Sequence, residues 1–420
     1  MTSLPAYDVA RVRKDFPLLQ REINGRSLAY LDSASSSQRP QQVLDAMSAY
    51  YEHHHANVHR GLYTLAIEAT DMYEGARDTV ARFVNAYDRS EIVFTKNVTE
   101  ALNLVARSIG DARPGSRLHV GPGDEILITE MEHHSNIVPW QLLCQRTGAT
   151  LRWLGITDDG RLDLSNLDEV CNERTRVVSF VLQSNILGTV NPTSQIVRRA
   201  REVGALVGLD AAQAVPHSPV DVQELGVDFL GFTGHKMCGP TGIGALWARH
   251  ELLDELPPFL GGGEMIAEVS MAASTYAPPP HKFEAGTPMI AEAIGLAAAI
   301  DYLVDIGLDA IKTHEKALTV HALDALAGVD GLRVLGPRNA ISRGGTISFA
   351  LGDLHPHDVG QVLDELGIAV RVGQHCAAPV CRRLGVPATT RASFYLYTTT
   401  EEVDALVAGL EHVKQVFRAA

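Results

Sequence analysis

Two residues of this sequence have the types and the spacing for carbonyl chemistry. Lys236 follows a strand-like run, 227–232, and precedes a glycine-rich turn, 239–244, while Asp210 follows a second apolar run, 205–209. A lysine amine can form a Schiff base with pyridoxal 5'-phosphate (PLP), and a carboxylate can keep the pyridine nitrogen protonated. The pair therefore indicates a PLP site, with a solvated surface lysine as the ordinary alternative. The glycine-rich turn does not open a helix directly after a strand, so it is not a dinucleotide fingerprint.

A third residue that could take part in chemistry is Cys376. It lies in a polar loop that contains Arg371 and His375 and ends at Pro379. Positive neighbours favour the thiolate, which is the nucleophilic form of cysteine. The alternative is an inert buried cysteine, but the polar loop favours reactivity.

Strand-like and helical runs alternate along the first half of the chain. This rhythm predicts a parallel sheet covered by helices, and ligands of such sheets bind at the carboxyl ends of the strands. The predicted strands are 91–95, 125–129, 150–154, 176–182 and 205–209. His133, Asn185, Asp210 and Lys236 follow soon after strand-like runs, so we expect them to converge at one edge.

Thr99 lies where the strand 91–95 passes into an apolar helix. The free N–H groups and the dipole of a helix N-terminus favour phosphate, and a threonine there can also simply cap the helix. Both roles are compatible.

The second half of the chain differs in its composition and in the order of its predicted elements. A long stretch rich in proline and glycine, 257–280, precedes an apolar helix at 294–306. Two strands, 345–351 and 368–372, and a final helix then predict a smaller α+β domain. We expect an N-terminal segment, 1–25, that packs with the small domain, then a large PLP-binding domain, 26–292, and a small C-terminal domain, 293–420, that carries Cys376.

Composition limits the classes of partner. The 420 residues are 45% hydrophobic and 20% charged, with a net charge of −14, which argues against nucleic acid and anionic membranes. No apolar run reaches transmembrane length, and Met1–Pro5 shows no signal-peptide pattern. The five scattered cysteines make a disulfide framework improbable, so a reducing cytoplasm is expected.

A run of histidines, Glu52-His53-His54-His55, invites a metal interpretation. Adjacent histidines on a helix point in different directions and cannot all reach one ion. We therefore expect no metal there.

With these residues in view, the chain resembles the class II, SufS-type cysteine desulfurases of the class V aminotransferase family, which have the type I fold of PLP-dependent transferases. The resemblance covers nearly the whole chain. Its motifs are Tyr30-Leu31-Asp32-Ser33, Asn57-Val58-His59-Arg60-Gly61, Glu132-His133-His134, Ser184-Asn185, Asp210 with Gln213, Gly234-His235-Lys236, the run 283–288, and Arg371 to Cys376.

The resemblance implies a role for each matching cofactor residue. Lys236 would carry PLP and move protons, Asp210 would pair with the pyridinium nitrogen, and Gln213 would bond the phenolic oxygen. His133 would stack on the ring and help protonation. The phosphate would be held by Thr99, Thr233 and His235, with Thr287 reaching in from the partner subunit of a homodimer.

The resemblance also implies a substrate and a sulfur acceptor. Asn185 and Arg391 would bind the carboxylate of L-cysteine, with Arg371 near the thiolate, and Cys376 would take the sulfur as a persulfide, leaving alanine. The sulfur would then serve iron–sulfur cluster assembly or another sulfur biosynthesis. His357, nineteen residues before the cysteine, would favour a zinc-containing SufU-like acceptor over a SufE-like one.

Departures from the family pattern keep an alternative open. They are Ala211, Cys238, Gln374 in place of the usual histidine, and Thr398. None removes a catalytic group, although Gln374 lies near Cys376. A selenocysteine lyase or a cysteine-conjugate C–S lyase of a specialised pathway is the alternative function. Cys238 and Cys381 are expected to be structural.

Overall fold

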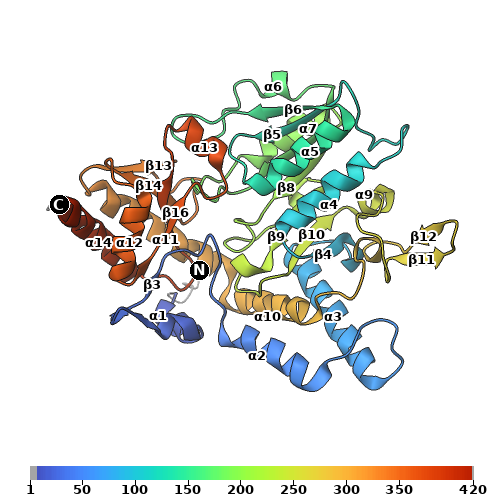
Figure 1. Ribbon diagram of the computed structural model, residues 1–420, viewed down its shortest axis with the longest axis horizontal. Coiled ribbons are helices and arrows are strands. Elements are labelled where there is room, and N and C mark those ends of the chain that lie inside the picture. Colours follow the sequence, from blue (N-terminus) through green and yellow to red (C-terminus); the bar gives the residue numbers. More distant parts are fainter. Residues whose placement is uncertain (1–6, 419–420) are drawn as a thin grey trace, which may run out of the picture.

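The computed structural model describes residues 7–418. Residues 1–6 of the predicted N-terminal segment, with Met1–Pro5, lie outside the described residues. Figure 1 shows a large sheet flanked by helices and, beside it, a smaller sheet with its own helices toward the C-terminus. The predicted combination of a large, mainly parallel-sheet domain and a smaller α+β domain is confirmed.

The large sheet has seven strands in the order β4-β10-β9-β8-β7-β5-β6. β10 runs antiparallel to both of its neighbours, and the strands from β9 to β6 pair in parallel. In that order, the bounds are Ile92–Thr95, Gly244–Ala248, Phe229–Thr233, Leu206–Asp210, Thr175–Val181, Glu125–Thr129 and Thr150–Leu154. We did not predict β10, and this strand makes the sheet mixed at one side.

Helices cover both faces of the large sheet because its strands alternate apolar side chains between them. On one face Phe229 packs with Val98 of α4 and Trp140 of α5. On the other, Leu230 belongs to the core of α3 and α10. The helices before the small domain are α1 (Val9–Lys14), α2 (Gln41–Ala49), α3 (Thr64–Phe83), α4 (Val98–Gly110), α5 (Val138–Thr147), α6 (Leu167–Val170), α7 (Thr193–Glu202), α8 (Val222–Leu225), α9 (His250–Glu255) and α10 (Ile290–Ile306).

The small domain is built on a four-stranded antiparallel sheet, β13-β14-β17-β16. Two of its strands, β13 (Leu332–Leu335) and β17 (Thr389–Ser393), were not predicted from the sequence. The other elements are β14 (Thr346–Leu351), β15 (Ile368–Ala369), β16 (Arg371–Gly373), α11 (Leu308–Ala327), α12 (Pro356–Glu365), α13 (Ala378–Arg383) and α14 (Thr400–Arg418). β17 carries Arg391, so this strand brings the small domain to the site.

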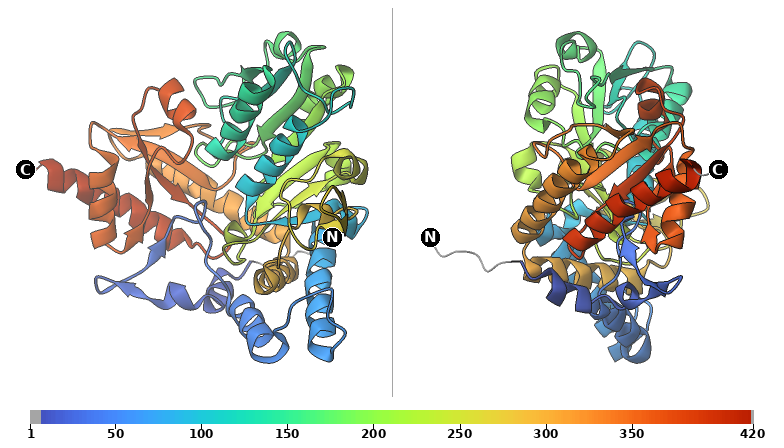
Figure 2. Two further views of the ribbon diagram at one scale, coloured as in Figure 1. Left: turned by 45° about the vertical axis from the view of Figure 1, so that its right-hand side comes forward. Right: turned by 90° about the vertical axis from the view of Figure 1, so that its left-hand side faces the viewer.

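The N-terminal segment lies against the small domain (Figure 2). Arg13 donates to the carbonyl of Tyr397 and pairs with Glu402 at 3.0 Å. β3 (Ala29–Tyr30) pairs in parallel with β15. The polypeptide thus passes along the small domain before it enters the large one at α2, and the exact domain bounds stay a prediction.

Short elements complete the chain. The two-stranded ribbons are β1 (Glu22–Ile23) with β2 (Arg26–Ser27), and β11 (Ile266–Val269) with β12 (Ser274–Tyr276). The second ribbon lies in the proline- and glycine-rich stretch and projects from the body of the molecule (Figure 1). Short turns of helix are η1 (Pro17–Gln20), η2 (Tyr50–His54), η3 (Arg89–Glu91), η4 (His134–Asn136), η5 (Gly234–Lys236) and η6 (His281–Phe283). Within residues 7–418, no helix has the length and apolarity that a membrane span requires.

Candidate active site

One cavity, of about 480 Å³, lies where the carboxyl ends of the large-sheet strands face the small domain. It gathers every predicted site residue except Thr287 and His357. The predicted residues that line it are Thr99, His133, Asn185, Asp210, Gln213, Thr233, His235, Lys236, Arg371, Cys376 and Arg391. The expected convergence of residues that follow strands is therefore confirmed as a placement, while their individual roles stay predictions.

The lysine and the acid lie at the ends of adjacent parallel strands. Asp210 is the last residue of β8, and Lys236 ends the helical turn that follows β9. Burial lowers the pKa of Lys236 to about 8, even though the carboxylate of Asp210 opposes this shift. Burial raises the pKa of Asp210. The amine thus reaches its neutral, nucleophilic form far more readily than an exposed lysine.

The N-terminus of α4 points into the same cavity because two glycines let it approach the sheet. A Cβ atom at Gly231 would lie 3.1 Å from the side chain of Val98, and one at Gly244 would lie 2.8 Å from the Cα atom of Asn97. Both distances are shorter than an ordinary van der Waals contact, so glycine at these positions allows the helix to come this close. Asn97 is the helix cap, since its side chain accepts from the N–H of Glu100. Thr99 is therefore not the cap, and its hydroxyl instead contacts Ser135 at 2.6 Å.

His133 is held with its Nδ1 as an acceptor. The N–H of Ser135 donates to Nδ1 at 3.1 Å, and the hydroxyl of Ser135 lies 3.0 Å from the same atom. Burial, with the nearby Lys236, lowers the pKa of His133 to about 3. The imidazole is neutral at physiological pH, and its remaining proton is on Nε2.

Arg391 is fixed on β17 by three acceptors. Nη1 donates to the carbonyl of Asn185 at 2.9 Å, and Nη2 donates to Asp32 at 3.1 Å and to the hydroxyl of Ser35 at 2.5 Å. Within residues 7–418, its Nε has no hydrogen-bond partner. A buried guanidinium with a free donor can receive a carboxylate.

The loop that carries Cys376 is held against the large domain by two hydrogen bonds. The N–H of His134 donates to the carbonyl of Cys376 at 2.8 Å, and Asn185 donates to the carbonyl of His375 at 2.7 Å. His375 and Cys376 both have left-handed backbone, with φ of 52° and 55°. Non-glycine residues rarely adopt this conformation, and where it persists the surroundings enforce it. The loop thus presents an exposed thiol at the cavity.

The cavity concentrates buried polar atoms that have no partner within residues 7–418. Each such atom costs about 1–3 kcal/mol unless something bonds to it. The unpaired atoms at this cavity are Asn185 Oδ1, Gln213 Oε1, Thr233 Oγ1, His375 Nδ1 and Arg391 Nε. Together with the helix N-terminus and the Lys236–Asp210 pair, they fit a ligand with a phosphate, a hydroxylated ring and a carboxylate, as PLP and an amino acid would supply.

Several residues at the cavity had no predicted role. Asp32 and Ser35 hold Arg391, and Ser135 joins Thr99 to His133. Asp32 belongs to a motif of the family resemblance, but no sequence signal connects it with Arg391, 359 residues later.

The remaining predicted residues lie elsewhere. Thr287 is exposed beside a second, smaller cavity formed with Phe94 and Phe283. His357 is exposed in the first turn of α12, and its N–H donates to the ring of His355. Cys238 and Cys381 are buried free thiols, as expected of structural cysteines.

Fold and site together define a PLP-dependent enzyme of fold type I. The chain belongs to the aminotransferase class-V family, whose model matches residues 29–406. The probable cysteine desulfurase of Streptomyces coelicolor is 67% identical, over 99% of this chain and 100% of its own length.

Two solved structures are similar over nearly the whole chain. The apo cysteine desulfurase of Thermococcus onnurineus is 40% identical, with a TM-score of 0.91 over 99% of this chain and 100% of its own. The cysteine desulfurase CsdA of Escherichia coli, solved as the S-sulfonic acid, is 37% identical, with a TM-score of 0.89 over 98% of this chain and 99% of its own.

Proposed function

We propose that this protein is an L-cysteine desulfurase that uses PLP and carries the sulfur on Cys376. The observation that supports this most is the meeting, in one cavity, of Lys236, Asp210, Arg391 and an exposed cysteine. The cysteine desulfurases to which the chain is similar give the same reaction class. PLP, when bound, supplies an electron sink that makes bonds near the amino-bearing carbon breakable.

Substrate binding uses the small domain. The free Nε of Arg391 donates to the carboxylate of L-cysteine, which satisfies one of the unpaired buried groups. Nδ2 of Asn185 uses one N–H for the carbonyl of His375 and can donate its second N–H to the same carboxylate. The three existing bonds of Arg391 fix the plane of its guanidinium before substrate arrives. Such preorganisation reduces the entropy that binding must remove.

Proton movements fall to Lys236 and His133. The Lys236 amine, with a pKa of about 8, can accept a proton at Nζ and return it near neutral pH. His133 keeps its proton on Nε2, because Nδ1 accepts from Ser135. Asp210 supplies the negative partner for a ring nitrogen at the floor of the cavity.

Sulfur transfer is a displacement at the substrate sulfur. The Cys376 thiolate attacks that sulfur, an S–S bond forms, and the C–S bond breaks with its electron pair left on the substrate carbon. That carbon takes a proton, so L-cysteine and the Cys376 thiol become L-alanine and a Cys376 persulfide. The exposed position of Cys376 then allows the outer sulfur to be handed on.

The finer assignments are part of this proposal. We place the enzyme in the SufS-type subclass and assign Thr287 to the phosphate site of the partner in a homodimer, which its exposure permits. His357 is assigned to a zinc-bearing, SufU-like acceptor, with a SufE-like protein as the alternative. The delivered sulfur would serve iron–sulfur clusters or another sulfur biosynthesis.

The test is alanine release from L-cysteine by the PLP-loaded enzyme, with the wild type and Cys376→Ala side by side. Desulfurase activity requires the thiol, so turnover should disappear in the variant, whereas Cys381→Ala should keep it. Turnover that survives in Cys376→Ala would instead support the selenocysteine lyase or C–S lyase alternative.

The acceptor is tested separately. A zinc-bearing SufU-like protein should stimulate alanine release by the wild type, and the stimulation should fall in His357→Ala with basal turnover unchanged. His412→Ala, at an exposed histidine of α14, is the control. Stimulation by a SufE-like protein alone, unaffected by His357→Ala, would reverse the acceptor assignment.

A further inference from the structure

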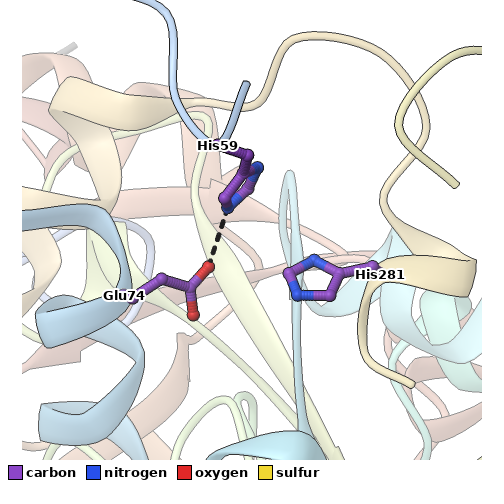
Figure 3. A group of neighbouring side chains, drawn as sticks. All are labelled: His59, Glu74 and His281. Atoms are coloured by element: carbon purple, nitrogen blue, oxygen red, sulfur yellow. Dashed lines mark hydrogen bonds and ion pairs between the residues drawn. The ribbon is translucent and has the colours of Figure 1, made fainter. Parts of the chain in front are cut away.

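Three side chains with metal-ligating atoms meet away from the active-site cavity. They are His59 from the loop before α3, Glu74 from α3, and His281 from η6. One ligand atom from each lies within 4.8 Å of the other two. Figure 3 shows the three side chains around one small space, with a bond between His59 and Glu74 and none from His281 to either. All three are half-buried, so the space can be reached from solvent.

The group combines ligands that a divalent transition metal prefers. Two imidazoles and one carboxylate form the protein part of a known zinc coordination pattern, in which a fourth position is left to water. Three different chain segments supply these ligands, unlike the adjacent histidines of the run 52–55. In that run His54 instead pairs with Glu68 at 2.9 Å.

The charge around the group favours a cation. Arg77 pairs with Glu74 at 3.0 Å and with Glu284 at 2.6 Å, and Arg89 pairs with Asp78 at 2.7 Å and lies 3.8 Å from Glu74. Three carboxylates against two guanidinium groups leave one net negative charge. Glu74 Oε2 accepts from Nε of Arg77 at 3.0 Å. Oε1 lies 3.0 Å from Nε2 of His59 and accepts a longer bond, of 3.3 Å, from Nη2 of Arg77, so Oε1 is the oxygen that a metal beside His59 would take.

The backbone also holds His59 in place without a metal. Its φ is 72°, in the left-handed region, and its N–H donates to the hydroxyl of Thr70 at 2.8 Å. A non-glycine residue keeps this unfavourable backbone conformation only where contacts with the surrounding structure enforce it. The imidazole of His59 is therefore aimed at Glu74 in advance.

We propose that His59, Glu74 and His281 form a binding site for a divalent transition metal of the zinc type. The metal replaces the hydrogen bond between His59 and Glu74 and takes His281 as its third ligand, with water in the open position. It joins α3 to the segment that runs from η6 to Glu284 and on to Thr287. The site is thus structural, and its occupancy stiffens the segment that carries Thr287.

The test measures Zn²⁺ binding by calorimetry to the PLP-loaded enzyme, prepared without a histidine tag. A Cys376→Ala background removes the exposed thiol as a competing ligand. We expect one Zn²⁺ per chain, at least a tenfold loss of affinity in His281→Phe, and no loss in the matched variant His53→Phe. Zinc should also raise the melting temperature of the parent and not that of His281→Phe.

A second variant guards against a folding defect. His59→Gln should lose the same affinity, with PLP absorbance and circular dichroism checked for both ligand variants. Equal zinc affinity in the parent and in folded His281→Phe or His59→Gln would overturn the proposal. A loss of zinc affinity in His53→Phe alone would place the zinc site at the histidine run 52–55 and would also overturn the proposal.

Discussion

Asp32 and Arg391, which are 359 residues apart in the chain, are joined by a hydrogen-bonded ion pair of 3.1 Å. The other oxygen of Asp32 lies 3.5 Å from Nη1 of Arg371. One carboxylate therefore contacts both arginines that we assign to the substrate end of the cavity. It holds Arg391 in position, and it also neutralises part of the charge that a substrate carboxylate would meet.

The first prediction concerns this carboxylate. Asp32→Ala should lower kcat/KM for L-cysteine by about 10- to 100-fold, mostly through KM, since a hydrogen bond to a charged group contributes about 1.5–3 kcal/mol. Asp32→Asn keeps an acceptor for Nη2 and should recover part of the loss. Steady-state kinetics of the two variants, with exposed Asp45→Ala as control, would measure it. A lower KM in Asp32→Ala would mean instead that Asp32 competes with the substrate carboxylate.

The second prediction uses an unpaired buried hydroxyl. In the described part of the chain Thr233 Oγ1 has no hydrogen-bond partner, and Thr233 lines the cavity in which the phosphate of PLP is expected. Thr233→Val should weaken PLP binding by about tenfold, at roughly 1.4 kcal/mol per factor of ten, while leaving the melting temperature of the cofactor-free protein equal or higher.

The matched control for Thr233→Val is Ser108→Ala. Ser108 also carries a buried hydroxyl that has no partner among the described residues, but it lies on α4 and does not line the cavity. This variant should leave PLP binding unchanged. Fluorescence titration of the cofactor-free proteins with PLP distinguishes the two, and equal affinities for wild type and Thr233→Val would remove Thr233 from the phosphate site.

The third prediction concerns pH. The neutral amine is the form of Lys236 that attacks the PLP aldehyde, and burial lowers its pKa to about 8. At pH 8 about half of the amine is then neutral, against roughly 0.4% for an ordinary lysine. The rate of PLP incorporation into the cofactor-free protein should rise through pH 8 and level off above it. A rate that keeps rising to pH 10 would show an unperturbed lysine.

The sequence predicted the residues of the cavity better than the connections among them. Strand ends are visible locally as apolar runs that stop at a polar residue, so Asp210 and Lys236 could be placed at one edge. β10 was missed because Gly244–Ala248 is a short apolar run that follows a glycine-rich turn, and nothing local distinguishes it from a loop. β17 was missed because the polar threonines and arginine of Thr389–Ser393 do not look like a buried strand.

Long-range contacts were beyond local patterns for a physical reason. The neighbours of Arg391 come from residues 32, 35 and 185, which only the tertiary packing of the chain brings together. The left-handed backbone of Cys376 likewise depends on the bond from His134. The spacing of residues along the sequence therefore does not predict contacts of this kind.

The last prediction concerns the buried ion pair between Arg77 of α3 and Glu284. Arg77 is fully buried, and both of its Nη atoms donate to the carboxylate of Glu284, at 2.6 and 2.8 Å. Arg77→Met keeps the apolar stem and removes the cationic partner of the buried Glu284, which keeps only its bonds from Tyr73 and the N–H of Phe94. Breaking a buried ion pair in this way costs about 3–5 kcal/mol. Guanidinium unfolding of the PLP-loaded enzyme, at one fixed protein concentration, would measure the loss.

The control for Arg77→Met is the same substitution at an exposed pair. Arg107 bonds Asp111 one helical turn away at 2.7 Å, and both side chains face solvent. Water and salt screen such a pair, so Arg107→Met should cost less than about 1 kcal/mol. Equal losses in the two variants would show that the Arg77–Glu284 contact adds nothing beyond a surface ion pair. A large loss confined to Arg77→Met would show that the buried bonds of Arg77, to Glu284, Glu74 and the carbonyl of Ile92, stabilise the fold far more than an exposed ion pair does.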